Sequence, residues 1–267
     1  MATFWDAEAA LYALATLQAT ALLAWGVSLW RRDVSVVDSL WSLFILGAAL
    51  TYAALAETGP RAPWLLPLAA LWALRLAGHI TWRNHGQPED PRYQAIRARN
   101  QPHFALKSLY LVFGLQAGLA WVVAQPLMVA AASPQPPNLL DALGVAHALF
   151  GIAFEAVADA QLARFKARPE HRGRVLDSGL WRYSRHPNYF GECCVWWGFG
   201  LVALAAGGGW ALLSPLLMTL LLLKVSGVAL MEQDIGQRRP DYADYIARTN
   251  AFIPGPPRPT RRSPQQA

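Results

Sequence analysis

Two pairs of ionisable residues lie one helical turn apart inside apolar stretches of this sequence. Glu155 and Asp159 are four residues apart, and so are Arg75 and His79. A spacing of four places both members of a pair on one face of a helix. A charge inside a membrane helix is costly, so each face should look into a bundle, towards a partner or water. We expect the two carboxylates to accept hydrogen bonds from ribose hydroxyls or an adenine amine, or to bridge cations of the following loop.

A further acidic residue, Asp38, lies one turn into an earlier apolar stretch. An ion pair between Asp38 and Arg75 would compensate both charges and join two helices. A chemical role for Asp38 is the alternative. The sequence alone leaves both interpretations open.

Long apolar runs must position these charges. About twenty apolar residues in a helix cross the roughly 30 Å of bilayer hydrocarbon. The last run is twice that length and has Gly207-Gly208-Gly209 at its midpoint, which predicts a helical hairpin. The runs are Ala9–Trp30, Val36–Ala56, Trp64–Thr81, Leu109–Ala132, Leu139–Leu162 and Phe190–Leu230. They predict an all-α integral membrane protein of about seven transmembrane helices, with residues 1–267 forming one transmembrane domain in the lipid bilayer.

The basic residues alternate between loops, which predicts an orientation. Arginine and lysine crowd the loops after the first, third and fifth runs and the C-terminal tail, whereas the intervening loops contain only Arg61. By the positive-inside rule the N-terminus is outside and the C-terminus is in the cytoplasm, in a bacterial inner membrane. The net charge of +6 is spread over several loops and does not form one patch, so we expect no nucleic-acid partner.

The loop after the fifth run is the most basic of all. Its seven cations are Arg164, Lys166, Arg168, Arg172, Arg174, Arg182 and Arg185. This is more charge than orientation requires, and it predicts a polyanionic ligand, with anionic lipid headgroups as the competing partner.

Metal chemistry and a soluble nucleotide-binding fold are not expected. The six histidines form no close pairs at ligand spacing, and the two cysteines are adjacent in the chain. A Gly-rich turn between a strand and a helix is also absent from the sequence.

The segment Ser178–Glu192, SGLWRYSRHPNYFGE, resembles the C-terminal signature of the steroid 5-alpha-reductase superfamily, most closely an uncharacterised bacterial branch. The resemblance extends back to Glu155 and resumes in the tail between Glu232 and Pro254. It implies a cofactor-binding half at residues 139–254, substrate-side helices at 1–107 and a disordered tail at 255–267.

The resemblance implies that NADPH binds in a cavity open to the cytosol. The phosphates, including the 2′-phosphate, would be bound by Lys166, Arg174, Arg182 and Arg185, because arginine presents paired donors that match phosphate oxygens. The acids Glu155 and Asp159 would bind the adenosine end, and Asn188 with Tyr189 the nicotinamide end. The implied cofactor-binding residues are Glu155, Asp159, Lys166, Arg174, Arg182, Tyr183, Arg185, His186, Asn188, Tyr189, Glu192 and Tyr245.

The implied reaction is hydride transfer from NADPH to a carbon–carbon double bond conjugated to a carbonyl, in an apolar, lipid-like substrate. The segment Gly78–Arg83 is similar to the one that carries a tyrosine in the steroid reductases, but Ile80 stands at the tyrosine position. The groups of the first half that could donate to a carbonyl oxygen are Asp38, His79 and Tyr52. We take Asp38 and His79 as the catalytic candidates and favour His79, whose ordinary pKa lies near neutrality.

Two other functions remain open. The segment Arg182–Tyr189 also looks like the signature of membrane methyltransferases that use S-adenosylmethionine to modify isoprenylcysteine or phospholipids. The number of loop cations favours the cofactor with more phosphates, which is NADPH. The other possibility is a small transporter or scaffold without chemistry.

Overall fold

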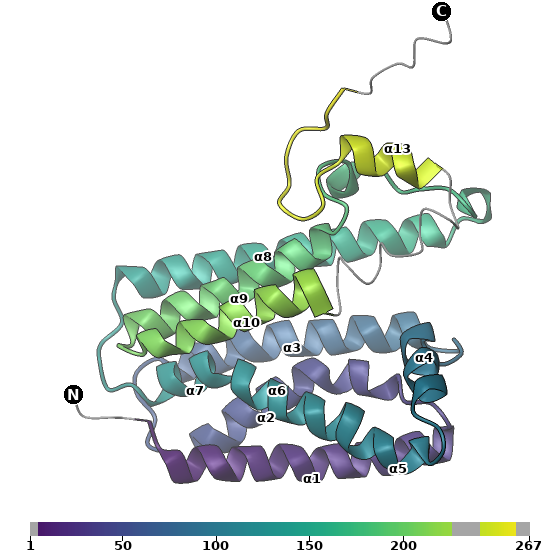
Figure 1. Cartoon of the computed structure of the whole chain (residues 1–267). Helices are drawn as coiled ribbons and strands as arrows, with labels where there is room; N and C mark the ends of the chain where they lie inside the picture. Colours follow the sequence, from purple (N-terminus) through teal and green to yellow (C-terminus); the bar gives the residue numbers. More distant parts are fainter. Residues whose placement is uncertain (1–4, 226–240, 260–267) are drawn as a thin grey trace, which may run out of the picture. The chain divides into compact units, whose positions relative to one another are not determined.

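A computed structural model describes residues 5–225 and 241–259, and all regular secondary structure in these residues is helical (Figure 1). The end of the last predicted apolar run, Glu232 and residues 260–267 of the predicted tail lie outside the described residues. The chain divides into two compact units. Unit 1 comprises residues 1–141 and 200–214, and unit 2 comprises residues 142–199 and 215–267.

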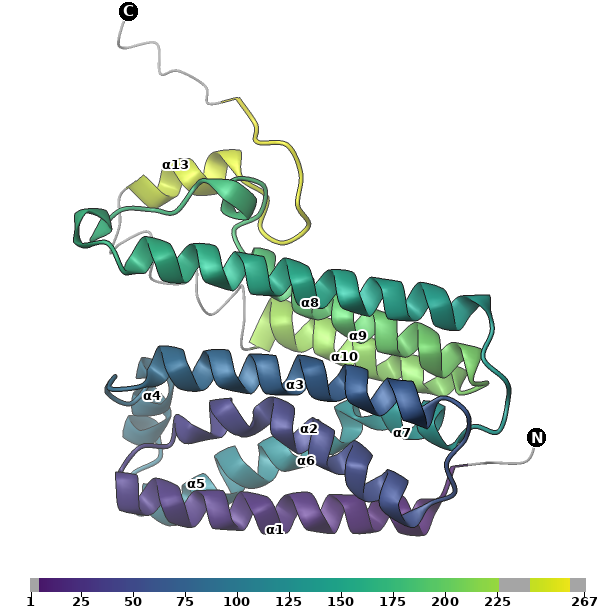
Figure 2. The same ribbon diagram turned by 180° about the vertical axis from the view of Figure 1, so that it is seen from behind.

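Unit 1 is a helical bundle in which α1, α2 and α3 pack in sequence and α6 packs against α1 and α2 (Figures 1 and 2). The Asp6 carboxylate caps α1 by accepting from the backbone N–H groups of Glu8 and Ala9. Arg32 ends this helix in the left-handed conformation. The elements are α1 (Ala7–Arg31), α2 (Val36–Leu55), α3 (Ala62–Asn84), α4 (Pro91–Arg99), α5 (Phe104–Ser108), the π-helical turn η1 (Leu109–Gly114), α6 (Leu115–Val123) and α7 (Gln125–Ala132).

The fourth predicted run begins earlier than expected and is not one regular helix. It starts at Phe104, passes through the π-helical turn, and divides at Ala124 into α6 and α7. Pro126 accounts for the division, because proline has no N–H to donate and its ring conflicts with the carbonyl four residues earlier.

Unit 2 contains most of a helical hairpin and the segments packed on it. Its elements are α8 (Leu139–Lys166, from residue 142), the 3₁₀ turns η2 (Pro169–His171) and η3 (Gly179–Arg182), α9 (Pro187–Ala205, to residue 199), α10 (Leu213–Leu220, from residue 215), the π-helical turn η5 (Leu221–Val225) and α13 (Asp241–Arg248).

The predicted hairpin is present. Gly207 adopts a positive φ of 84° after α9, and the 3₁₀ turn η4 (Gly209–Leu212) leads into α10. Thr219 of α10 contacts Cys193 and Trp197 of α9.

Within the residues that the structure describes, five helical stretches are long and apolar enough to cross a membrane. They are Ala7–Arg31, Val36–Leu55, Ala62–Asn84, Phe104–Ala132 and Leu139–Lys166, and each corresponds to a predicted run. The protein is therefore an all-helical, multi-pass membrane protein.

Arg61, the one arginine of the loops predicted to be outside, is fully buried in unit 1. Its Nε donates to Asp141 Oδ1 at 2.7 Å and its Nη2 to Asp141 Oδ2 at 2.8 Å. The guanidinium also donates to the carbonyl oxygens of Gln135, Pro136 and Ala205. A buried charge is tolerated when it is paired and fully hydrogen-bonded, as here. This arginine therefore joins the loop before α3, the loop before α8 and the end of α9.

Glycines allow α8 and α9 to approach closely in unit 2. A Cβ atom on Gly191 would lie 2.7 Å from the backbone nitrogen of Glu155, and one on Gly151 would lie 2.6 Å from the carbonyl oxygen of Gly191. A Cβ atom on Gly198 would lie 2.6 Å from the backbone nitrogen of Ala148. Small residues that bring backbones together are typical of membrane helix interfaces. This contact sets the position of the polar residues at the start of α9 relative to those of α8.

Replacing Gly191 by alanine should therefore force the two helices apart. We expect Gly191→Ala to lower the free energy of unfolding by about 1–3 kcal/mol, the usual cost of overpacking a tight contact. Thermal unfolding of the detergent-solubilised protein measures this. Gly47→Ala in α2 is the matched control, because nothing lies within 4 Å of its Cβ position. Equal effects of the two substitutions would contradict the proposed role of the close contact.

Candidate functional site

Three carboxylates are buried on the facing surfaces of α8 and α9 in unit 2. Glu155, Asp159 and Glu192 are 4%, 6% and 5% exposed. Asn188 Nδ2 donates to Asp159 Oδ1 at 3.3 Å, and Trp196 Nε1 donates to Glu192 Oε1 at 3.1 Å. We call Glu155, Asp159, Asn188 and Glu192 the α8–α9 polar face. Because Gly191 touches the backbone of Glu155, the polar face depends directly on the glycine contact.

The signature segment is attached to α8 beside this polar face. The backbone N–H of Leu180 donates to Gln161 Oε1 at 2.9 Å, and Trp181 Nε1 donates to the carbonyl oxygen of Ala158 at 3.0 Å. Gly179 is required here for two reasons, since its φ is +59° and a Cβ atom would lie 2.6 Å from the Gln161 amide. The loop therefore has a defined position over the C-terminal half of α8.

The C-terminal segment binds the other side of the signature loop. Ser184 Oγ donates to the carbonyl oxygen of Phe252 at 2.7 Å, and the backbone N–H of Gly255 donates to the carbonyl oxygen of Tyr183 at 3.0 Å. The Tyr245 hydroxyl donates to the carbonyl oxygen of Trp181. Burial raises the pKa of Tyr245, so this hydroxyl keeps its proton and remains a donor. The signature loop thus lies between α8 and the C-terminal segment.

Arg185 makes part of this attachment. Its side chain is buried, and Nη1 donates to the carbonyl oxygens of Thr249, at 2.6 Å, and Ile246, at 3.3 Å. Its backbone N–H also donates to the carbonyl oxygen of Asn250. A cation at the C-terminal end of a helix satisfies carbonyl groups that have no partner within the helix. Arg185 therefore helps to fix α13 on the loop.

The remaining predicted cofactor-binding residues divide into two groups. His186 is buried and its ring stacks on Tyr189, with centroids 5.6 Å apart and planes 2° from parallel. Exposed side chains form the second group, which consists of Lys166, Arg174, Arg182 and Tyr183. The structure thus gathers the predicted acids, Asn188, His186 and Tyr245 inside unit 2, with most of the predicted phosphate-binding cations at its surface.

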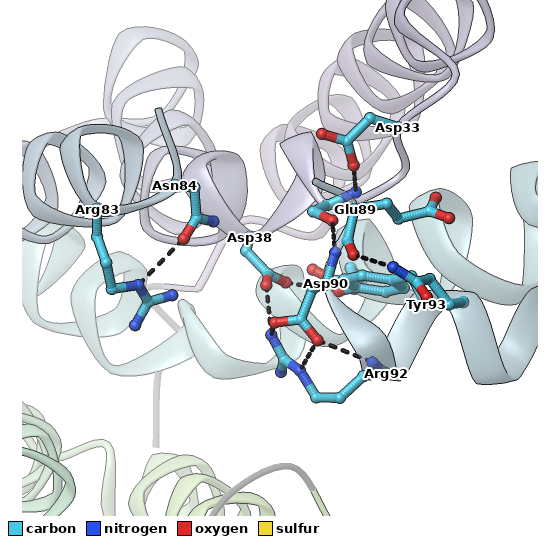
Figure 3. A network of polar contacts seen from close by, with 11 residues as sticks. Asp33, Asp38, Arg83, Asn84, Glu89, Asp90, Arg92 and Tyr93 are labelled. Carbon is cyan, nitrogen blue, oxygen red and sulfur yellow. Dashed lines mark hydrogen bonds and ion pairs between the residues drawn. The ribbon is translucent and has the colours of Figure 1, made fainter. Parts of the chain in front are cut away.

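In unit 1, Asp38 is bound by residues of α4 (Figure 3). Asp38 Oδ2 accepts from Arg92 Nη2 at 2.6 Å, and Oδ1 accepts from the Tyr93 hydroxyl at 2.5 Å. Gln116 of α6 donates to the same hydroxyl at 3.0 Å. The alternative that paired Asp38 with Arg75 is wrong, because Arg92 and Tyr93 are its partners in the described part of the chain. Burial, followed by the charge of Asp38, raises the pKa of Tyr93, so the hydroxyl stays protonated.

Two more acids extend this network at the start of α4 (Figure 3). Asp90 caps α4 by accepting from the backbone N–H of Arg92 and also binds the Arg92 side chain at 2.9 Å. Glu89 accepts from Arg97 Nη2 at 2.6 Å and from the backbone N–H of Val34 at 2.9 Å. Together these contacts fix α4 against the start of α2.

The other two donor candidates of the first half lie apart from this network. His79 is half-buried in α3, and its ring lies 6.0 Å from that of Trp82. Tyr52 is fully buried near the end of α2, where its hydroxyl accepts from the backbone N–H of Asp6 at 2.8 Å.

Comparison with known proteins places both regions in one family. A family model described as a protein of unknown function, DUF1295, matches residues 24–249, which include the Asp38 network and the signature loop. The chain belongs to this family. An uncharacterized protein of Schizosaccharomyces pombe is 26% identical over 212 residues, which are 68% of this chain and 61% of that protein, so the chain spans less than two thirds of the relative's length. No solved structure matches the chain.

In this DUF1295 protein, three side chains to which the sequence assigned no role hold parts of the candidate site in place. Gln161 and Trp181 attach the signature loop, and Trp196 binds Glu192. The spacing of four between Glu192 and Trp196 could have identified that pair, because it places both on one helix face. Nothing in the spacing of Gln161 indicates its role. Across the described ranges, no cluster of three or more potential metal ligands occurs.

The Arg92 guanidinium makes the contribution of Asp90 to protein stability depend on pH. Burial by itself would raise the pKa of Asp90, but hydrogen bonds and charge from Arg92 outweigh burial and lower it. A carboxylate with a lowered pKa in the folded state stabilises the protein above its unfolded pKa, near 3.9. That contribution is lost as the pH falls through the folded value.

Asp90→Asn tests this contribution, because asparagine still caps a helix but carries no charge. We expect the variant to be less stable than wild type near neutral pH by about 1 kcal/mol, a value suited to a partly exposed ion pair. The difference should shrink as the pH falls below about 4. Thermal unfolding across this range measures it, with Glu57→Gln, an exposed carboxylate between α2 and α3, as control. A difference that does not change with pH would contradict the charge interpretation.

Proposed function

We propose that this chain is a membrane-embedded oxidoreductase that uses NADPH to reduce a carbon–carbon double bond conjugated to a carbonyl in a lipid-like substrate. The DUF1295 family is associated with the steroid 5-alpha-reductase-like superfamily, which supports the proposal. The observation that carries it is the α8–α9 polar face, which lies beside a signature loop bearing exposed cations. Buried acceptors next to surface cations suit a ligand that has both hydroxyl groups and phosphates.

The residues present suit such a nucleotide. Glu155 and Asp159 can accept from ribose hydroxyls or an adenine amine, and Asn188 has an amide that can serve the nicotinamide end. Lys166, Arg174 and Arg182 are the surface cations that would bind phosphates. Because Arg185 binds the carbonyls at the end of α13, we assign it the task of positioning the loop. When bound, NADPH supplies the hydride.

The substrate side needs a group that protonates or stabilises the enolate oxygen formed on hydride addition. Both oxygens of Asp38 are already bound, one by the Arg92 guanidinium and one by the Tyr93 hydroxyl. His79 is therefore the donor that we propose, since an imidazole can give up a proton near neutral pH.

We further propose seven crossings, formed by α1, α2, α3, the stretch α5–α7, α8, α9, and α10 with η5. An odd number places the termini on opposite sides, with the N-terminus outside and the nucleotide site facing the cytoplasm of a bacterial cell. The burial of Arg61 supports this orientation, because it leaves the loops predicted to be outside without an exposed arginine.

A methyltransferase that uses S-adenosylmethionine is the second candidate. The use of Arg185 in attaching α13 reduces the number of cations available for phosphate, whereas the polar face contains three buried carboxylates. Such a set suits the ammonium and sulfonium charges of S-adenosylmethionine. The two candidates therefore differ in the sign of ligand charge that the site must balance.

Titration of the purified protein with NADPH, NADH and S-adenosylmethionine distinguishes the candidates. A ligand that binds only the folded state raises its thermal stability. We expect NADPH to give the largest shift, and Arg174→Ala to weaken NADPH by about tenfold or more while affecting NADH less, since a charge-assisted hydrogen bond to the 2′-phosphate is lost. Arg164→Ala, at an exposed arginine outside the proposed site, is the control. Binding of S-adenosylmethionine without binding of NADPH would move the protein to the second candidate.

His79→Ala tests the proposed proton donor. We expect turnover of a lipid enone, followed by NADPH oxidation with a panel of steroid-like and isoprenoid enones, to fall about a hundredfold or more, as for the loss of a general acid. NADPH binding should remain as in the wild type, which separates chemistry from cofactor loss. Full turnover in this variant would remove His79 from the mechanism.

A further inference from the structure

Exposed cations gather at one end of unit 1, at the junction of α1, α4 and α5. Trp25 Nε1 of α1 donates to the carbonyl oxygen of Ala105 in α5 at 2.8 Å. Lys107 Nζ of α5 donates to the carbonyl oxygen of Asn100, which ends α4, at 3.0 Å. Figures 1 and 2 both show α4 and α5 at the end of the bundle where α1 finishes. The cations at this junction, which we call the basic corner, are the exposed Arg31, Arg32 and Arg99 and the half-buried Lys107.

The acids near the basic corner do not neutralise it. Asp38 and Asp90 bind Arg92, and Glu89 binds Arg97, so two other arginines balance two of these three negative charges. Asp33 accepts from the backbone N–H of Ser35 at 2.8 Å. Within residues 5–225 and 241–259, no carboxylate pairs with a cation of the basic corner. The four cations of the basic corner outnumber the two remaining negative charges, one from this network and one from Asp33, so the corner presents a net positive charge.

Exposed apolar side chains lie next to these cations. Trp30, in the last turn of α1, is 85% exposed, and Leu106 of α5 is 63% exposed. Tyr110 follows in the π-helical turn and is also exposed. Tryptophan and tyrosine at the ends of membrane helices lie at the depth of the lipid headgroups. Arg31 and Arg32, which follow Trp30 directly in the sequence, are then at the depth of the headgroup phosphates.

We propose that the basic corner binds the phosphate groups of anionic phospholipids. Charge selects the partner, because a zwitterionic headgroup offers no net negative charge. The exposed Trp30 and Leu106 side chains require a ligand whose phosphate is joined to acyl chains, so the partner is a lipid and not a free phosphate. This property does not depend on the cofactor or reaction of unit 2.

The test is thermal unfolding of the purified full chain in neutral detergent, titrated with phosphatidylglycerol, phosphatidylcholine or sn-glycerol 3-phosphate. We expect stabilisation by phosphatidylglycerol alone. Each basic residue near an anionic surface contributes about fivefold in affinity. The triple variant Arg31→Gln, Arg32→Gln, Arg99→Gln should therefore need at least about tenfold more phosphatidylglycerol for half of the effect.

The matched control is Arg164→Gln, Arg168→Gln, Arg172→Gln, which removes the same charge from exposed positions in unit 2. It should respond to phosphatidylglycerol as the wild type does. An equal loss in the control, equal stabilisation by phosphatidylcholine, or the same effect from sn-glycerol 3-phosphate would each overturn the proposal. The single variants Arg31→Gln and Arg99→Gln make the same test with less risk to folding, each with a loss of about fivefold.

Discussion

The close contact of α8 with α9 is the constraint on which the candidate site depends. Gly151, Gly191 and Gly198 bring the two backbones within a distance that no Cβ atom could occupy. The same contact places Asn188 and Glu192 opposite the acids of α8, where they form the polar face. Small residues at a helix interface let the two backbones approach closely, and a side chain added at these positions would force the helices apart. Gly191 of the signature segment thus has a structural task that supports the polar residues around it.

Two charged networks of unit 1 each combine an ion pair with hydrogen bonds to carbonyl or hydroxyl groups. Arg61 binds Asp141 through two hydrogen bonds and donates to three carbonyls, and Asp38 accepts from Arg92 and Tyr93. Such sites are costly to desolvate, and they are stable only when every polar atom has a partner. Each of them joins elements that are distant in sequence, so the charges contribute to the specificity of the fold.

The sequence predicted the helices well and the partners of charged residues poorly. Apolar runs located five spanning stretches, and three consecutive glycines located the hairpin turn, because length and composition are local properties. The partner of Asp38 lies in α4, a short polar helix that no apolar period indicates. Its capping residue, Asp90, and Pro91 mark its start only once the helix is known. In the candidate site, the residues Glu155, Asp159, Asn188 and Glu192 were all named from sequence, but the attachment of the loop through Gln161 is a tertiary contact with no local pattern.

The loop cations show why a count of charges overstates the capacity of a site to bind anions. Arg185 is one of seven cations in its loop, yet its guanidinium binds the carbonyls that end α13. Arg248 of α13 pairs with Asp177 of the same loop, so one acid of the loop is also used in attaching that helix. Charges that attach the loop are unavailable to a ligand, and the cations of the loop with exposed side chains include Lys166, Arg174 and Arg182. The positive charge that the loop presents to solvent is therefore smaller than the number of its cations in the sequence, because buried Arg185 serves to attach α13.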